Sequence, residues 1–204
     1  VLEVLANDEL PRVRAIIAEE LKSASNVPKK TIRHLAEDLE EIVSVPILEY
    51  SPLLSEADLL EIVARGMKGR ALVAVARRRN VSEPVVDAVV DKKDKKATQA
   101  VLENNSSVIS ERTFDKISDE AAENKEWHNA MVYRDGLPVR TVMRIATFVS
   151  AALMERLIEK NSKQKDLVEK LRKTVRERIE NGELGDDDDE GIPPAVDRAE
   201  ADYN

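Results

Sequence analysis

The chain of 204 residues contains no cysteine, six glycines and few aromatic side chains. Without cysteine it can have no disulfide, no thiolate nucleophile and no cysteine-ligated zinc site, and we expect it in a reducing compartment, the cytoplasm. No apolar run reaches the roughly 18 residues that cross a bilayer, so we expect no membrane span. Because aromatic residues make up 3% of the chain and charged residues 35%, the composition favours thin aliphatic layers beneath a charged surface.

Residues 1–182 carry no formal net charge, because their acidic and basic side chains are equal in number. From Glu183 onward there are nine acidic side chains and one basic one, Arg198. Subtracting these from the 40 acids and 32 bases of the whole chain leaves 31 of each in residues 1–182. A neutral body gives no net-charge argument for nucleic-acid binding. The imbalance of −8 therefore comes from residues 183–204, which we interpret as a separate, solvated acidic tail.

What the sequence does contain is a unit of 27 or 28 residues that recurs five times. Each copy opens with a large apolar residue followed by Ser or Pro, which favour the start of a helix. Large apolar residues recur five and eight positions later, on one face of a helix. The opening residues are Val27, Leu54, Val81, Ile109 and Leu137; the fifth-position residues are Ile32, Leu59, Val86, Phe114 and Val142; the eighth-position residues are Leu35, Ile62, Val89, Ile117 and Ile145.

Each first helix is followed by a break and a second short apolar run, over residues 42–48, 71–75, 97–101, 127–131 and 151–157. A hairpin of this size cannot bury its own apolar stripe, so neighbouring hairpins must stack. Residues 1–160 are therefore predicted to form an all-α, right-handed α-solenoid of about five two-helix repeats. Residues 10–22 fit the second helix of an earlier repeat. Pro46 should kink or end its helix, and the last unit could be one continuous helix.

A charged amphipathic helix is predicted over residues 161–182. Val168, Leu171, Val175 and Ile179 form its apolar stripe, which must be covered. Either the helix caps the final repeat, which we favour because a solenoid needs a polar-faced end, or the same four residues pair two chains in a homodimer.

The tail contains acidic residues spaced like those of a calcium-binding loop, Asp186, Asp188, Glu190 and Asp197. Two features oppose that interpretation. Consecutive prolines at 193 and 194 interrupt the segment after Gly191, and an aspartate stands where the loop normally has a bidentate glutamate. We therefore favour an ordinary acidic tail and predict no metal site.

Three segments resemble a bacterial family of uncharacterised proteins, the domain of unknown function 2336. They are residues 46–63, which include the motif Ser51-Pro52-Leu53-Leu54-Ser55, residues 73–79 and residues 102–105. The resemblance covers roughly residues 10–160 and leaves out the charged helix and the tail. It implies a HEAT-like helical-repeat fold, and it brings no established activity, catalytic residue or cofactor.

No enzyme signature is present. The chain lacks a Gly-x-Ser-x-Gly motif, a glycine-rich phosphate loop and a His-Glu-x-x-His motif. The two histidines, His34 and His128, lie about three repeats apart in sequence, and a stacked array would keep them from forming a metal or acid–base pair. We predict a protein without catalytic residues or cofactors.

The leading hypothesis is a protein-interaction scaffold that binds its partner on the concave face formed by the second helices. Arg70, Arg77, Arg78 and Arg79 are the candidate contacts for an acidic protein partner. Trp127 is the one tryptophan, and a further candidate in the groove. In a self-inhibited version, the acidic tail covers this basic face until a partner displaces it.

The alternative is a nucleic-acid or phosphate-ligand binder that uses the arginines together with a lysine cluster. The cluster comprises Lys92, Lys93, Lys95 and Lys96, in the turn between two predicted helices. Arginines at a helix C-terminus are already favoured by the helix dipole, and the aromatic side chains that stack on bases are nearly absent. These observations favour the protein partner.

Overall fold

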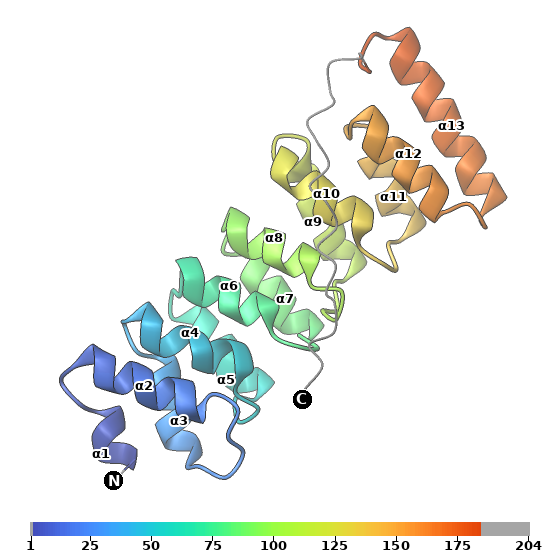
Figure 1. Cartoon of the computed structure of the whole chain (residues 1–204). Coiled ribbons are helices and arrows are strands. Elements are labelled where there is room, and N and C mark those ends of the chain that lie inside the picture. Colours follow the sequence, from blue (N-terminus) through green and yellow to red (C-terminus); the bar gives the residue numbers. More distant parts are fainter. Residues whose placement is uncertain (1, 185–204) are drawn as a thin grey trace, which may run out of the picture.

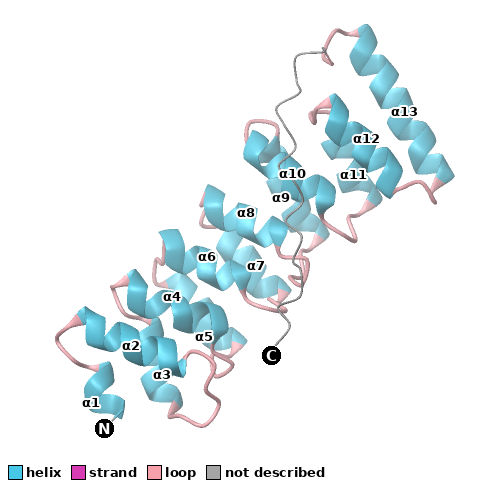
Figure 2. Cartoon of the chain, in the orientation of Figure 1, coloured by secondary structure: helices cyan, strands magenta, loops and turns pink. Residues whose placement is uncertain are grey.

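The computed structural model describes residues 2–184 and is all-α over that range, with thirteen α-helices, one short 3-10 helix and no strand (Figures 1 and 2). The five units supply the hairpins α3 (Lys29–Ala36) with α4 (Glu41–Tyr50), α5 (Glu56–Ala64) with α6 (Gly69–Arg77), α7 (Glu83–Val90) with α8 (Lys95–Glu103), α9 (Glu111–Ala121) with α10 (His128–Tyr133), and α11 (Val139–Ile145) with α12 (Ala151–Lys160). Helices α1 (Leu2–Ala6) and α2 (Pro11–Leu21) precede them, η1 (Lys125–Trp127) leads into α10, and α13 (Lys165–Glu180) follows.

The sequence unit sets where each first helix begins. Helices α3, α5, α7, α9 and α11 all start two residues after the opening residue of a unit, and the intervening Ser or Pro is the N-cap residue. Ser55 accepts a hydrogen bond from the backbone N–H of Asp58, while the Asp58 carboxylate accepts one from the backbone N–H of Ser55. This reciprocal pair satisfies two N–H groups that helix geometry leaves without partners.

The fifth and eighth positions of the unit form the buried face of the first helices, as predicted. All ten side chains are at most 6% exposed. Removing these apolar surfaces from water is the main favourable contribution to folding. The period of the sequence is therefore the period of the buried core.

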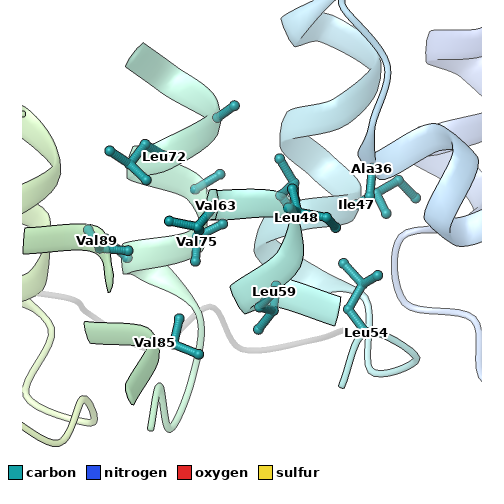
Figure 3. Close-up of a cluster of buried hydrophobic side chains, with 14 of the residues drawn as sticks. Ala36, Ile47, Leu48, Leu54, Leu59, Val63, Leu72, Val75, Val85 and Val89 are labelled. Carbon is teal, nitrogen blue, oxygen red and sulfur yellow. The ribbon is translucent and has the colours of Figure 1, made fainter. Parts of the chain in front are cut away.

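The helices form two rows in which each member packs on the next. In one row α2 packs on α4, α4 on α6, α6 on α8, α8 on α10 and α10 on α12; in the other, α5 packs on α7, α7 on α9, α9 on α11 and α11 on α13. Figure 1 shows that α1 and α13 lie at opposite ends of this arrangement. The core runs between hairpins: in Figure 3, Leu48 of α4, Val63 of α5 and Val75 of α6 share one cluster.

Ion pairs also join neighbouring first helices. From α3, the Nζ of Lys29 lies 2.5 Å and the Nη1 of Arg33 lies 3.4 Å from the carboxylate of Asp58 in α5. Further along, Lys116 of α9 pairs at 2.6 Å with Asp91, which follows α7. Arg144 of α11 pairs with Asp119 of α9. Basic side chains of this row are thus paired with carboxylates of neighbouring units.

Two local expectations are settled in part or corrected. Of the two outcomes expected at Pro46, a kink or a helix end, the second is wrong, because α4 continues from Glu41 to Tyr50. The carbonyl that Pro46 leaves without an N–H partner is that of Ile42; this residue is 52% exposed, so water can reach the turn. The last unit is not one continuous helix, since α11 ends at Ile145 and the hydroxyl of Ser150 caps a separate α12.

The predicted charged helix is α13, but its buried face differs from the predicted stripe. Leu167, Leu171 and Arg178 are buried, and the helix packs on α11 and α12. Of the stripe Val168, Leu171, Val175 and Ile179, only Leu171 is buried, and Ile179 is 56% exposed. Because Leu171 already lies under its own chain, a homodimer could use only the other three residues of the stripe, and that pairing stays a prediction.

The pKa of Asp58 generates a prediction about acid stability. Burial alone would raise this pKa, but hydrogen bonds from Lys29 and Ser55 outweigh burial and lower it from 3.8 to about 2. A carboxylate whose pKa is depressed by folding stabilises the fold above its unfolded pKa and loses that contribution as the pH falls through the folded pKa. Asp58→Asn should therefore lower the free energy of unfolding near neutral pH, and the deficit should shrink as the pH falls from about 4 to about 2.

Urea unfolding followed by circular dichroism across this pH range measures the deficit. Asp91→Asn is the matched control, because Asp91, like Asp58, pairs with a lysine of a neighbouring first helix but its side chain is 59% exposed. That variant should differ little from the parent chain at any pH. A deficit for Asp58→Asn that stays constant down to about pH 2 would contradict this account of Asp58.

Candidate functional site

A groove of about 520 Å³ runs across the row of second helices α4, α6 and α8. Its floor is apolar, formed by Val45, Val73, Ala74 and Ala100. Its polar lining consists of Glu49, Arg70, Arg77, Lys96, Gln99 and Glu103. Each of the three helices contributes side chains, so the groove exists only because the hairpins stack.

The basic side chains of this groove differ from those on the other row of helices. Arg70, Arg77 and Lys96 are exposed and form no ion pair with any residue between 2 and 184. Glu103 accepts a hydrogen bond of 2.8 Å from Gln99. The groove therefore offers an apolar strip flanked by three cations and two carboxylates.

The four candidate arginines are separated by the fold. Arg70 and Arg77 line the groove, and Arg79 is exposed but outside it. Arg78 points the other way: its guanidinium donates to the backbone oxygen of Leu48 at 2.5 Å and to that of Ser51 at 2.7 Å. The structure therefore gives Arg78 a contact within the chain, at the C-terminal end of α4, and its contact with a partner stays a prediction.

Arg78 belongs to a series of polar residues at the ends of the second helices. Asn104 donates from Nδ2 to the carbonyls of Ala76 and Arg78 at 2.8 and 2.7 Å. Lys160 donates to the carbonyl of Tyr133 at 2.7 Å. In each case the side chain reaches the C-terminal end of the second helix one unit earlier.

Arg134 is the most buried member of this series, at 5% exposure. Its Nη1 donates to the carbonyls of Val101, Leu102 and Asn104 at 3.0, 3.1 and 2.9 Å, and its Nη2 donates to that of Ser107 at 2.6 Å. The last carbonyls of a helix lack intrahelical partners and carry partial negative charge. A cation from the next hairpin satisfies both requirements at once, and the neutral amide of Asn104 supplies the donors alone. We call Arg78, Asn104, Arg134 and Lys160 the interhelix clamps.

Arg178 of α13 makes the same kind of contact with the row of first helices. Its Nη1 donates to the carbonyls of Ala146 and Val149 at 3.1 and 2.6 Å, just after α11. The sequence analysis did not predict the role of the clamp residues. Residues 78, 104, 134 and 160 nevertheless follow one another at steps close to the repeat length. That spacing was the signal that could have found them.

Trp127 is not available to a partner. It is 2% exposed, and its indole Nε1 donates to the carbonyl of Lys95 at 3.1 Å. The indole therefore fills the core between α8 and α10, and the prediction that it contacts a partner is wrong.

The two histidines do not form a site. His34 is exposed on α3, whereas His128 is buried at the start of α10, where its Nε2 donates to the carbonyl of Ala121 at 2.8 Å. Burial lowers the pKa of His128, which favours the neutral ring beside Phe148. Within residues 2–184 no three acidic or histidine side chains are grouped as metal ligands. The tail residues Asp186, Asp188, Glu190 and Asp197 lie outside the described residues.

The expectation that all four lysines lie in one turn is wrong: Lys92 and Lys93 lie between α7 and α8, whereas Lys95 and Lys96 are the first residues of α8. Lys92 reaches back to the carbonyl of Ala64 at 3.5 Å. Lys93 has a left-handed backbone with a φ of 55°, and the carbonyl of Lys95 accepts the bond from Trp127. Lys96 is the one lysine of the cluster that lines the groove.

None of the described helices is long and apolar enough to cross a membrane. The longest, α13, has 16 residues, and charged side chains occur throughout it.

The clamps generate a prediction about stability. Arg134→Met should keep much of the side-chain volume but remove the guanidinium donors from four carbonyls, of which those of Val101 and Asn104 keep the Ser107 hydroxyl as a donor. The loss should lower the free energy of unfolding by about 2–4 kcal/mol. Arg140→Met is the control, since the Arg140 side chain is 78% exposed and makes one ion pair of 3.5 Å. Urea unfolding of both variants measures the difference. Equal stabilities for the two variants would show that the Arg134 clamp is unimportant.

Comparison with known proteins gives one match. No curated protein and no solved structure is significantly similar to the chain. The model of a family described as "Uncharacterised protein conserved in bacteria (DUF2336)" matches residues 43–203. The matched range differs from the expected residues 10–160 at both ends: it begins at residue 43, and it extends through α13 into the acidic tail. The chain therefore belongs to the uncharacterised bacterial family DUF2336.

Proposed function

We propose that this protein is a non-enzymatic interaction module that binds a segment of a protein partner along the groove over α4, α6 and α8. The observation that carries the proposal is the contrast between the two rows of helices. On the row of first helices, Arg33, Lys116 and Arg144 pair with carboxylates of neighbouring helices. In the groove, Arg70, Arg77 and Lys96 have no such partner among the described residues.

The lining of the groove favours a peptide as ligand. Arginine is enriched at protein interfaces because its planar guanidinium binds carboxylates with two hydrogen bonds. Arg70 and Arg77 flank the apolar floor at Val73 and Ala74, so an acidic side chain and an apolar side chain of the same segment could be bound together. The partner segment is thus expected to be acidic with interspersed apolar residues.

The finer architecture is part of the same proposal. Stacked hairpins of this length are typical of a HEAT-like, right-handed α-solenoid of about five repeats, with the second helices on its concave face. On that interpretation the groove is a section of an extended binding surface that follows the array.

The alternative, a nucleic-acid or phosphate ligand, is less well supported. Glu49 and Glu103 line the same groove as the three cations and would repel a polyanion. Lys92 reaches back to the carbonyl of Ala64, the lysines at positions 93 and 95 do not line the groove, and Trp127 is buried.

A pair of charge reversals tests the proposed binding face. Arg70→Glu combined with Arg77→Glu should weaken binding of the native protein partner at least about tenfold, because two favourable charge pairs become repulsive. The measurement is affinity purification of the tagged full chain from its native cell, with mass spectrometry, followed by titration of the identified partner. Arg79→Glu is the matched control, since Arg79 is exposed but outside the groove.

Partners recovered equally by both variants would contradict the proposal. Retention of the full chain on heparin at about 50 mM salt, lost in the double variant, would favour the nucleic-acid alternative instead.

A further inference from the structure

A groove larger than the one over α4, α6 and α8 lies at the end of the array, between α12 and α13. Its volume is about 950 Å³, and its apolar lining includes Met154, Ile158, Val168, Val175, Ile179 and Leu184. Ile179 is 56% exposed. An apolar surface of this kind on a charged protein marks a contact that something should cover.

Comparison between hairpins identifies this groove as an uncovered stacking surface. The residues two positions before the clamps Arg78, Asn104 and Arg134 are Ala76, Leu102 and Val132, and each is 0% exposed. The residue two positions before the clamp Lys160 is Ile158, which remains partly exposed. The first three lie on second helices that have a following second helix packed beside them, whereas no described second helix follows α12. In each earlier hairpin, a second helix follows the first and covers this surface. No described helix follows α13, so the groove lies where such a second helix would pack.

We propose that the groove between α12 and α13 is a docking site for residues 192–203 of the chain's own acidic tail. These residues contain Ile192, Val196, Ala199 and Tyr203 at spacings of four, three and four. That spacing places the four side chains on one face of a helix, and the prolines at positions 193 and 194 suit its first turn. The segment thus has the apolar stripe that the end of the array lacks.

The length of the intervening chain permits this contact. Leu184, the last described residue, itself lines the groove. From there to Ile192 the chain can span up to about 26 Å, and the 16 residues of α13 extend over about 24 Å. The segment can therefore reach any point along the groove, and its tethering gives a high effective concentration.

Charge complementarity supports the same occupant. Residues 185–204 carry eight acidic side chains and one basic one. The rim of the groove carries Lys165, Arg172 and Arg176 against Glu155 and Glu169. None of these three cations forms an ion pair with another residue in the range 2–184. The acidic run at 186–190 would pass these cations on its way to the groove.

Cysteine cross-linking in the full chain tests the proposal directly, because the chain has no native cysteine. The test pair is Ile179→Cys with Val196→Cys, and the control pair is Arg79→Cys with Val196→Cys, which places the second thiol beside the arginine groove. With a short bismaleimide, the test pair should form an intramolecular cross-link at least about ten times faster than the control pair.

Faster cross-linking of the Arg79 pair would overturn the proposal in favour of a tail that covers the arginines. Cross-links only between two chains would overturn it in favour of a second copy in the groove. No cross-link in either pair would also overturn it, and would leave the groove to a separate protein.

Two tail variants supply a second measurement that leaves the folded array unchanged. Val196→Asp places a charge on the apolar stripe, whereas Ala201→Asp places the same charge on the opposite side of the helical pattern. Hydrogen exchange of residues 151–184 in the full chain should become about tenfold faster in Val196→Asp and stay unchanged in Ala201→Asp. Equal exchange in both variants would contradict the docked tail.

Discussion

Burial of each hairpin's apolar stripe against the next hairpin is the interaction on which the rest of the structure depends. Leu48, Leu72 and Leu102 lie on three successive second helices, and all are 0% exposed. With eight to eleven residues in most of its helices, a single hairpin has too little apolar surface to offset the entropy of ordering it. Stability therefore resides in the interfaces, which also form the groove over α4, α6 and α8.

Polar contacts repeat at the same period and make the stacking specific. Arg78, Asn104, Arg134 and Lys160 each place donors on the last carbonyls of the preceding second helix. On the other row, ion pairs such as Lys116 with Asp91 join successive first helices. Apolar stripes alone would tolerate some slippage along the helix axis, whereas each clamp fits the carbonyls of one register. Arg70 and Arg77 are neither clamps nor members of an ion pair among the described residues. They therefore stand out as candidate contacts for a partner.

The sequence predicted the helical positions well because burial imposes a short, regular spacing. The N-caps at Ser55 and Ser110 and the buried residues Ile32 and Val142 follow directly from that spacing. It did not predict side-chain direction within a cluster: Arg77 and Arg78 are adjacent, yet one lines the groove and the other caps α4. Long-range acceptors decided this outcome, and they lie 27 and 30 residues away. The same limit applied to Trp127 and to the stripe of α13, whose buried face was decided by the position of α12.

The distance over which a single core defect spreads shows most directly whether neighbouring hairpins stabilise one another. Leu72→Ala in the middle of α6 removes buried contacts worth about 2–5 kcal/mol, and Leu39→Ala, at a residue that is 99% exposed, is its control. Hydrogen exchange should become faster in α4 and α8 as well as in α6 of the Leu72 variant, because neighbouring hairpins stabilise one another. Faster exchange confined to α6, with α4 and α8 as protected as in the Leu39 variant, would contradict stability that resides in the interfaces.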